Sequence, residues 1–290
     1  MKKLGNLVED RWIEGTGEGT TLYNAINGVP IASASTDGID IHSMYDYARS
    51  NGGYALRKMT FQERGIMLKK LALHLHSIKN KFYIVSAETG ATKTDSWIDI
   101  EGGIGNLFAN ASLRRKLPDT SFAVDGDFIP LSKEGTFGGH HILVPKEGVA
   151  VHINAYNFPI WGMLEKIAVN LLAGVPAIVK PATVTSFLTE YMVREIHASG
   201  ILPVGALQLV CGSARDLLDF VDERDVVTFT GSASTGQALK VHPRIIQHSV
   251  PFNLEADSLN AAILGPDAGP DTPEFDLFVK EIRNEMTIKC

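Results

Sequence analysis

Four polar side chains follow short apolar runs, each at a point where a strand is predicted to end. Asn157 comes after "VHIN", Lys180 ends "AIVK", Ser232 follows "VVTFTG", and Glu255 ends "FNLE". An amide can donate to a developing oxyanion, an ammonium can hold a ribose or phosphate, and a carboxylate can act as a general base. A serine beside the main-chain N–H groups of a helix start is typical of a pyrophosphate site. Together, these groups suit a nucleotide-dependent reaction at a carbonyl carbon.

Each of these residues also has a structural explanation that needs no ligand. Asn157 precedes Phe158-Pro159, so it can simply form the turn before a helix. Lys180 can extend its ammonium from an apolar strand into solvent, and Ser232 can cap a helix. Glu255 can be a solvated strand end or part of an ion pair. An apolar crevice would instead raise the pKa of Glu255 and suit it to act as a base.

The elements that must position these residues alternate from residue 148 onward. Val- and Ile-rich strands are predicted at 148–154, 176–180, 206–212 and 225–231, and helices of 10–15 residues separate them. This order predicts an α/β fold with a doubly wound parallel sheet. Such sheets bind ligands beyond the carboxyl ends of their strands, which is where all four polar residues are expected. A helix is also predicted over 214–223.

The N-terminal half of the sequence does not show this alternation of strands and helices. The first 60 residues are rich in Gly and Thr, and short strands joined by glycine turns are predicted over 10–35, with Gly15–Gly19 as a hairpin turn. Thr60 and Glu63 fit a capping box that opens an amphipathic helix, and a second helix covers roughly 92–116. Pro, Gly and Asp punctuate short extended runs over 117–146, which predicts a β-hairpin arm.

Composition excludes several classes of protein. The chain has 290 residues, 44% of them hydrophobic, and a net charge of −6, so neither nucleic acid nor a membrane is an expected partner. Two cysteines build no disulfide framework, which suits a reducing cytoplasm, and Cys211 is predicted to be a small buried hydrophobe. The histidines of the pairs His74/His76 and His140/His141 lack ligand spacing, so no metal site is predicted.

Four motifs in order resemble those of the NAD(P)-dependent aldehyde dehydrogenases. "NAYNFP" is similar to the family's P-W-N-F-P, "KPAT" to K-P-A/S-E, "FTGSASTG" to F-T-G-S-x-x-x-G, and "NLEADS" to E-L-G-G-K-S. The resemblance covers the whole chain. It implies a Rossmann-like NAD(P)-binding domain over 1–255, interrupted by the 117–146 arm through which a full-length parent would form homo-oligomers. It also implies that 256–290 begins a catalytic domain that is incomplete here.

The resemblance also implies roles for individual residues. A cysteine thiolate attacks the aldehyde, Asn157 holds the oxyanion, hydride leaves for the nicotinamide, and water activated by Glu255 hydrolyses the thioester. The positions matched to cofactor binding are Ile153, Asn154, Lys180, Ala182, Thr183, Gly212, Thr230, Gly231, Ser232 and Gly236.

Two departures from the family pattern refine the expectation. Thr183 replaces the usual acid after K-P-A. Since a carboxylate there would repel a 2′-phosphate, we expect NADP as the cofactor, with NAD as the alternative. "EADSLN" and "INAYNFPIWGMLEK" resemble the dehydrogenase half of the bifunctional ring-opening enzymes of phenylacetate degradation. That branch oxidises a CoA-linked semialdehyde to the carboxylate. A related branch acts on dehydroadipyl-CoA semialdehyde in benzoate degradation, and these residues do not separate the two.

Cys290 lies at about the family's spacing from Glu255, but it does not follow the Gly-Gln of the family's G-Q-x-C motif. In the phenylacetate branch the nucleophile comes four positions beyond the residue that matches Cys290. We therefore expect that Cys290 is not the nucleophile and that this chain alone is inactive. The alternative is a non-catalytic nucleotide-binding or assembly module.

Overall fold

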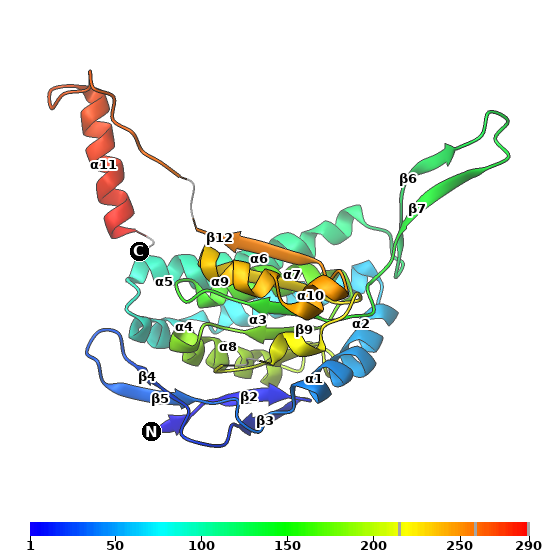
Figure 1. Ribbon diagram of the computed structural model, residues 1–290, viewed down its shortest axis with the longest axis horizontal. Coiled ribbons are helices and arrows are strands. Elements are labelled where there is room, and N and C mark those ends of the chain that lie inside the picture. The colour runs from blue at the N-terminus through cyan, green and yellow to red at the C-terminus, as the bar shows by residue number, and fades with distance from the viewer. Residues whose placement is uncertain (214–215, 258–259, 289–290) are drawn as a thin grey trace.

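A seven-stranded sheet forms the centre of the molecule in the computed structural model, which describes residues 1–213, 216–257 and 260–288 (Figure 1). The strand order is β12-β11-β8-β9-β10-β2-β3. The strands are β2 (Gly5–Val8), β3 (Arg11–Glu14), β8 (Ala150–Ile153), β9 (Ala177–Lys180), β10 (Leu207–Leu209), β11 (Val226–Gly231) and β12 (Phe252–Ala256). The neighbours from β12 to β10 pair in parallel, and β2 and β3 add an antiparallel hairpin at one edge.

Strands are added to the two sides of β8 in turn. From β8 the chain proceeds through β9 to β10 on one side, and β11 and β12 lie on the other side. A topological switch point therefore lies between β8 and β11, where a crevice opens at the carboxyl ends of the strands. The doubly wound sheet predicted from the sequence is confirmed.

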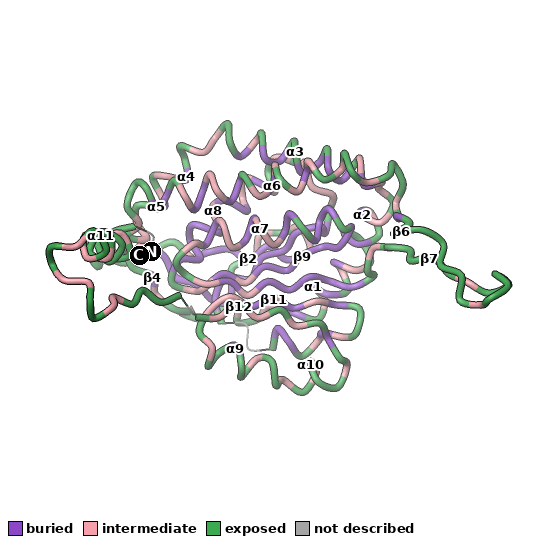
Figure 2. The backbone as a smooth tube through the Cα atoms, turned by 90° about the horizontal axis from the view of Figure 1, so that it is seen from above, coloured by how far each residue is buried: buried purple, intermediate pink, exposed green. Residues whose placement is uncertain are grey.

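Helices cover both faces of this sheet (Figure 2). The first face carries α3 (Phe61–Ser77), α6 (Gly103–Ser112), α7 (Pro159–Leu172) and α8 (Ser186–Ala198); the second carries α1 (Ile41–Tyr47), α9 (Ala233–Lys240) and α10 (Pro243–Gln247). Further helices are α2 (Tyr54–Lys58), α4 (Lys79–Ser86), α5 (Lys93–Trp97) and α11 (Pro273–Thr287). The capping box of Thr60 and Glu63 at the start of α3 is confirmed.

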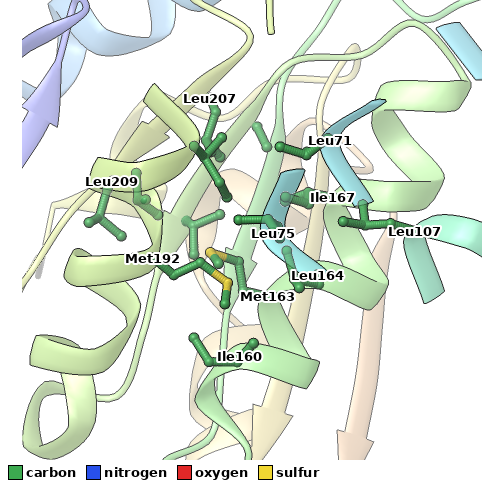
Figure 3. Packing of buried hydrophobic residues seen from close by; sticks show 14 of the residues in the cluster. Leu71, Leu75, Leu107, Ile160, Met163, Leu164, Ile167, Met192, Leu207 and Leu209 are labelled. Carbon is green, nitrogen blue, oxygen red and sulfur yellow. The ribbon is translucent and has the colours of Figure 1, made fainter. Parts of the chain in front are cut away.

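Apolar side chains from α3, α6, α7, α8 and β10 interlock in the larger core (Figure 3). Arg64 of α3 is buried within it, with no exposed surface. Its guanidinium donates to the carbonyls of Leu56, Met59 and Leu172, at 3.1, 2.6 and 2.7 Å. Met59 follows the last residue of α2 and Leu172 ends α7, where helices leave acceptors unpaired; the Leu56 carbonyl, in the last turn of α2, also accepts from the Met59 N–H. Arg64 thus joins two helix ends to α3.

The glycine run Gly15–Gly19 does not form the predicted hairpin turn. It links two sheets, because β3 pairs with β2, whereas β4 (Thr20–Tyr23) pairs with β5 (Pro30–Ala34) in a three-stranded sheet with β1 (Lys2–Lys3). A Cβ at Gly15 would lie 2.3 Å from the Ser35 carbonyl oxygen, so glycine is needed for close backbone approach rather than for a turn. The hairpin turn is at Glu9 and Asp10, where φ is 50° and 58°.

The helix predicted over 214–223 is reduced, among the described residues, to a single 3₁₀ turn at Leu217–Phe220. Val221 is already extended, and the carboxylate of Asp222 accepts from the main-chain N–H of Arg224. Aspartate side chains compete with helical hydrogen bonds in this way, and they outweigh the local leucine pattern here. Residues 214–215 lie outside the described part of the chain.

The predicted hairpin arm is confirmed as β6 (Ala123–Pro130) and β7 (Gly138–Leu143), which extend away from the body (Figure 1). Within the described part of the chain, these two strands pair only with each other. Its exposed apolar side chains include Val124, Phe128, Ile129, Phe137, Ile142 and Leu143. A two-stranded ribbon of this kind is marginally stable by itself and is normally packed against other structure.

Helix α11 stands apart from the body, and none of its described residues is buried (Figure 1). Within the described ranges, no helix combines the length and apolar character needed to cross a bilayer. Cys290 lies outside the described residues, so the expectation that it is not the nucleophile stays a prediction. Cys211 is fully buried, as predicted.

Candidate active site

The predicted site residues gather along one edge of the sheet. Ile153 at the end of β8 pairs with Lys180 at the end of β9, and it also pairs with Phe229 of β11. One residue further along β11, Thr230 pairs with Glu255 of β12. Because parallel strands run in the same direction, their carboxyl ends meet at this edge.

Alternation along the strands then divides these residues between two faces. Ile153 packs against the core beneath α9 and α10, and Lys180 shares that face with Ile178. Asn154 points the opposite way, toward α7, where a Cβ added to Gly162 would lie 3.8 Å from its side chain. Any contact of Asn154 with a ligand on the Lys180 face must therefore come from its main chain. Among the residues that the structure describes, neither polar atom of its buried side-chain amide has a hydrogen-bond partner.

Asn157 and Glu255 line the same cavity, on the α7 side of the edge. This cavity has a volume of about 250 Å³ and is lined by Ile98, Ala155, Asn157, Phe158, Trp161, Gly162, Glu165, Lys166, Thr230 and Glu255. The hydroxyl of Thr230 donates to Glu255 Oε2 at 3.0 Å. The Glu255 carboxylate is exposed, so the apolar crevice considered for it is not formed by the described residues. The cavity nevertheless presents an amide and a carboxylate to one small volume.

Three further residues that line this cavity were not predicted from the sequence: Trp161, Glu165 and Lys166. Glu165 Oε1 accepts from the Lys166 ammonium and Oε2 accepts from the Trp161 indole N–H, both at 2.8 Å. They lie on α7, directly after the Asn157 turn. Trp161 and Glu165 are four residues apart, so the sequence places them on one side of a helix. Helical spacing alone does not show which side of the helix borders a cavity.

Asp99 was also missed, and it fixes the turn that carries Asn157. It lies in the π-helical turn Ile98–Gly102, is 3% exposed, and accepts from the main-chain N–H groups of Ile160 and Trp161 at 3.0 and 2.7 Å. These N–H groups begin α7, where helices leave donors unpaired. Burial raises the pKa of Asp99 to about 7, although the two N–H bonds oppose this change.

We expect this raised pKa to make the stability of the chain depend on pH. The unfolded chain loses the Asp99 proton near pH 4 and the folded chain only near pH 7, so the free energy of unfolding should fall as pH rises between them. Asp99→Asn should reduce the difference in unfolding free energy between pH 5 and pH 8 by about 2 kcal/mol. Urea denaturation at both pH values measures this, with exposed Asp127→Asn as control. An unchanged pH dependence would contradict the assignment.

On the opposite face, Lys180 retains hydrogen-bonding capacity. Its ammonium is partly buried and donates to the Pro181 carbonyl oxygen at a long 3.4 Å, and no ion pair of Lys180 is found among the described residues. Burial lowers its pKa. A partly desolvated ammonium with spare donors fits a ribose or phosphate. Ala182 and Thr183 follow Pro181, and Thr183 opens a 3₁₀ turn that ends at Thr185.

Ser232 caps α9, as the ligand-free explanation predicts. Its hydroxyl accepts from the Thr235 N–H at 3.3 Å, and Gly231 ends the preceding strand. At the same helix start, a carboxylate oxygen of Asp257 accepts from the Ala233 N–H at 3.3 Å. Gly236 lets α9 approach the sheet, because a Cβ there would lie 2.3 Å from Leu254. An anion therefore already occupies part of this helix start.

Gly212 follows β10, at the same edge, and its φ of 129° favours glycine. A Cβ at this position would lie 3.3 Å from the Thr36 side chain. The sequence-predicted positions thus converge on one rim, with the matched cofactor side chains of Ile153 and Lys180 on one face and the cavity of Asn157 and Glu255 on the other.

Comparisons with known proteins agree with this architecture. The model of the aldehyde dehydrogenase family matches residues 12–282. The 3,4-dehydroadipyl-CoA semialdehyde dehydrogenase of Aromatoleum evansii is 47% identical over 288 residues, covering 99% of this chain and 56% of that protein. The D-glyceraldehyde dehydrogenase (NADP(+)) of Picrophilus torridus is 33% identical over 189 residues, covering 62% of this chain and 36% of that protein.

Solved structures show the same fold. Betaine aldehyde dehydrogenase from Staphylococcus aureus superposes with a TM-score of 0.78 at 20% identity, covering 97% of this chain and 54% of that one. A 3,6-anhydro-L-galactose dehydrogenase gives 0.72 at 22% identity, covering 88% and 52%. The chain thus spans about half the length of these proteins. Since the family model spans nearly all of the chain and a relative is 47% identical along it, the chain belongs to the aldehyde dehydrogenase family.

Proposed function

We propose that this chain provides the dinucleotide-binding part, the oxyanion donor and the general base of an NAD(P)-dependent dehydrogenase for a CoA-linked semialdehyde. The observation that carries the proposal is the shared cavity of Asn157 and Glu255 beside the switch point of the sheet. Aldehyde oxidation needs a donor for the oxyanion and a base for water within reach of one carbon atom.

Asn157 and Glu255 would take part in the family's thioester chemistry, and the nucleophilic thiolate is not among the described groups at this edge. A cysteine thiolate adds to the aldehyde carbon, and the Asn157 amide donates to the oxygen that becomes negative. A bound nicotinamide supplies the hydride acceptor. Glu255 then takes a proton from the water that attacks the thioester, which releases the carboxylate product and the thiolate. The Thr230 hydroxyl, 3.0 Å from Glu255, holds the carboxylate toward the cavity.

We place the cofactor on the face of Lys180. Its ammonium would bind the adenosine ribose, Ser232 and the start of α9 would bind the pyrophosphate, and the remaining rim positions would contact the dinucleotide through their main chain and small side chains. Asp257 would have to release the Ala233 N–H, which it now holds at 3.3 Å. Thr183 places no negative charge beside Lys180, so a 2′-phosphate is not repelled, and NADP is the expected cofactor.

Identity at 47% to a 3,4-dehydroadipyl-CoA semialdehyde dehydrogenase supports a CoA-linked semialdehyde from aromatic degradation as the substrate. This relative favours the benzoate-type semialdehyde over the phenylacetate-type semialdehyde that the motif resemblance also suggests. Both are aldehydes at the end of a chain that carries CoA at its other end, so the same site chemistry serves either one.

Cofactor binding tests the proposal with the chain itself. Isothermal titration with NADP should show binding to one site, and Lys180→Met should weaken it at least about tenfold, since one charge-assisted contact is lost. The control Lys116→Met alters an exposed lysine outside the site and should leave the affinity unchanged. If the chain binds neither NADP nor NAD, the proposal is wrong.

We also propose that the arm formed by β6 and β7 joins copies of the protein. Replacing Ile129 and Phe137, which are 54% and 66% exposed, with lysine should shift sedimentation toward the monomer. Val204→Lys, at an exposed position off the arm, is the control and should not change the association state. Equal sedimentation of the arm variant and the unmodified chain would contradict this role.

A further inference from the structure

A second cavity lies between α4 and the segment formed by α5 and the π-helical turn Ile98–Gly102. These elements lie side by side (Figures 1 and 2). The cavity has a volume of about 530 Å³, twice that of the cavity of Asn157 and Glu255. It is an open groove rather than a core void, and no step of the proposed reaction uses it.

The groove combines two cations with two aromatic rings. Lys79, Asn80 and Tyr83 enter it from α4, and Lys93 and Trp97 enter it from α5. Trp97 is 55% exposed, whereas tryptophan side chains are highly buried on average. Ring faces that remain accessible beside ammonium groups are the elements that bind a nucleobase and its phosphates.

The charge balance of the groove is positive. Its one carboxylate, Glu101, accepts from the Lys79 ammonium at 2.8 Å and from the Tyr83 hydroxyl at 2.6 Å. These bonds compensate the charge of Glu101. Lys93 forms no ion pair with any of the described residues, so its ammonium is available to an anion. The remaining lining at Ala87 and Ala91 is small and apolar, which leaves room for a flat ring.

The groove borders the candidate active site. Trp97 lines the groove, and the next residue, Ile98, lines the cavity of Asn157 and Glu255. A long ligand whose reactive end lies beside Asn157 would pass over Ile98 and Trp97 before its other end reached the lysines of the groove. CoA has the matching layout, because its adenine and phosphates sit at the far end of a long, flexible, uncharged arm.

We propose that the groove between α4 and α5 binds the adenosine phosphate end of the CoA-linked substrate, with the adenine against Trp97 and the phosphates at Lys93 and Lys79. This inference rests on the proposed function, since it assigns the part of the substrate that does not react. Binding energy at this remote end would hold the semialdehyde in the reaction cavity, and it would distinguish CoA-linked aldehydes from free ones.

Titration calorimetry with CoA tests the proposal, with NADP present in excess so that the dinucleotide site is filled. Lys93→Glu and Trp97→Ala should each weaken CoA binding at least about tenfold, whereas Trp97→Phe keeps a stacking ring and should stay within about threefold. Lys70→Glu makes the same charge change on the exposed side of α3 and should have no effect. Both groove positions are exposed, so these variants should fold.

Three results would overturn the assignment. They are no binding of CoA, CoA binding that is insensitive to Lys93→Glu and Trp97→Ala, and ADP binding as tight as CoA with the same losses, which would indicate a site for free nucleotides. NADP titration of the same samples keeps the two proposals apart. If NADP binds and CoA does not, only the groove assignment fails; if no dinucleotide binds, the proposed function fails, whatever the CoA result.

Discussion

Replacing Thr183 with glutamate should lower the affinity of the chain for NADP by about 30-fold and leave its affinity for NAD equal or higher. Thr183 is the third residue after Lys180 and opens the turn at the end of β9. A carboxylate there would lie close to a 2′-phosphate and repel it, while it could accept hydrogen bonds from the free ribose hydroxyls of NAD. A like-charge contact of about 2 kcal/mol corresponds to a factor of about 30 in affinity.

Parallel titrations of NAD and NADP measure the effect. Val184→Glu is a matched control, because it adds the same charge one residue further on, at a position that is 58% exposed. If Thr183→Glu and Val184→Glu change the ratio of the two affinities equally, only the net charge matters. In that case Thr183 does not face the 2′ position, and the assignment of the Lys180 face to the adenosine ribose is wrong.

Arg64→Leu should lower the free energy of unfolding by about 3–5 kcal/mol, which is a large part of the total stability of a domain. The carbonyls of Met59 and Leu172 would lose their donor inside the core, and leucine cannot replace it, whereas the Leu56 carbonyl would keep the Met59 N–H at 3.2 Å. The guanidinium also packs over the Phe61 ring at 4.5 Å. Burial lowers the pKa of Arg64 to about 10, so it stays charged at neutral pH.

Urea denaturation followed by circular dichroism gives this free energy. Arg115→Leu, at an exposed position near the end of the second helical segment, controls for the loss of one positive charge. Arg64→Lys is informative as well, because a lysine can reach one of the carbonyls but cannot serve all of them. A loss below about 1 kcal/mol for Arg64→Leu would show that the carbonyls of Met59 and Leu172 find other donors.

The sequence alone determined the central sheet, since β-branched strands separated by amphipathic helices allow few other arrangements. It also determined the edge at which Asn157, Lys180, Ser232 and Glu255 meet, because residues that end parallel strands must share one edge. The capping box of Thr60 and the hairpin arm followed from local hydrogen bonding and turn chemistry, which depend on neighbours in the chain.

Contacts between residues far apart in the chain decided the rest. Gly15 and Gly19 lie close to the backbone of Ser35 and Ala34 at the end of β5, which no local pattern reveals. Asp99 lies about 60 residues before the helix start that it caps, and Trp97 borders a groove made with α4. The physical reason is that a residue type fixes what a side chain can do, whereas its burial, its partners and the cavity it faces are set only when distant segments pack together.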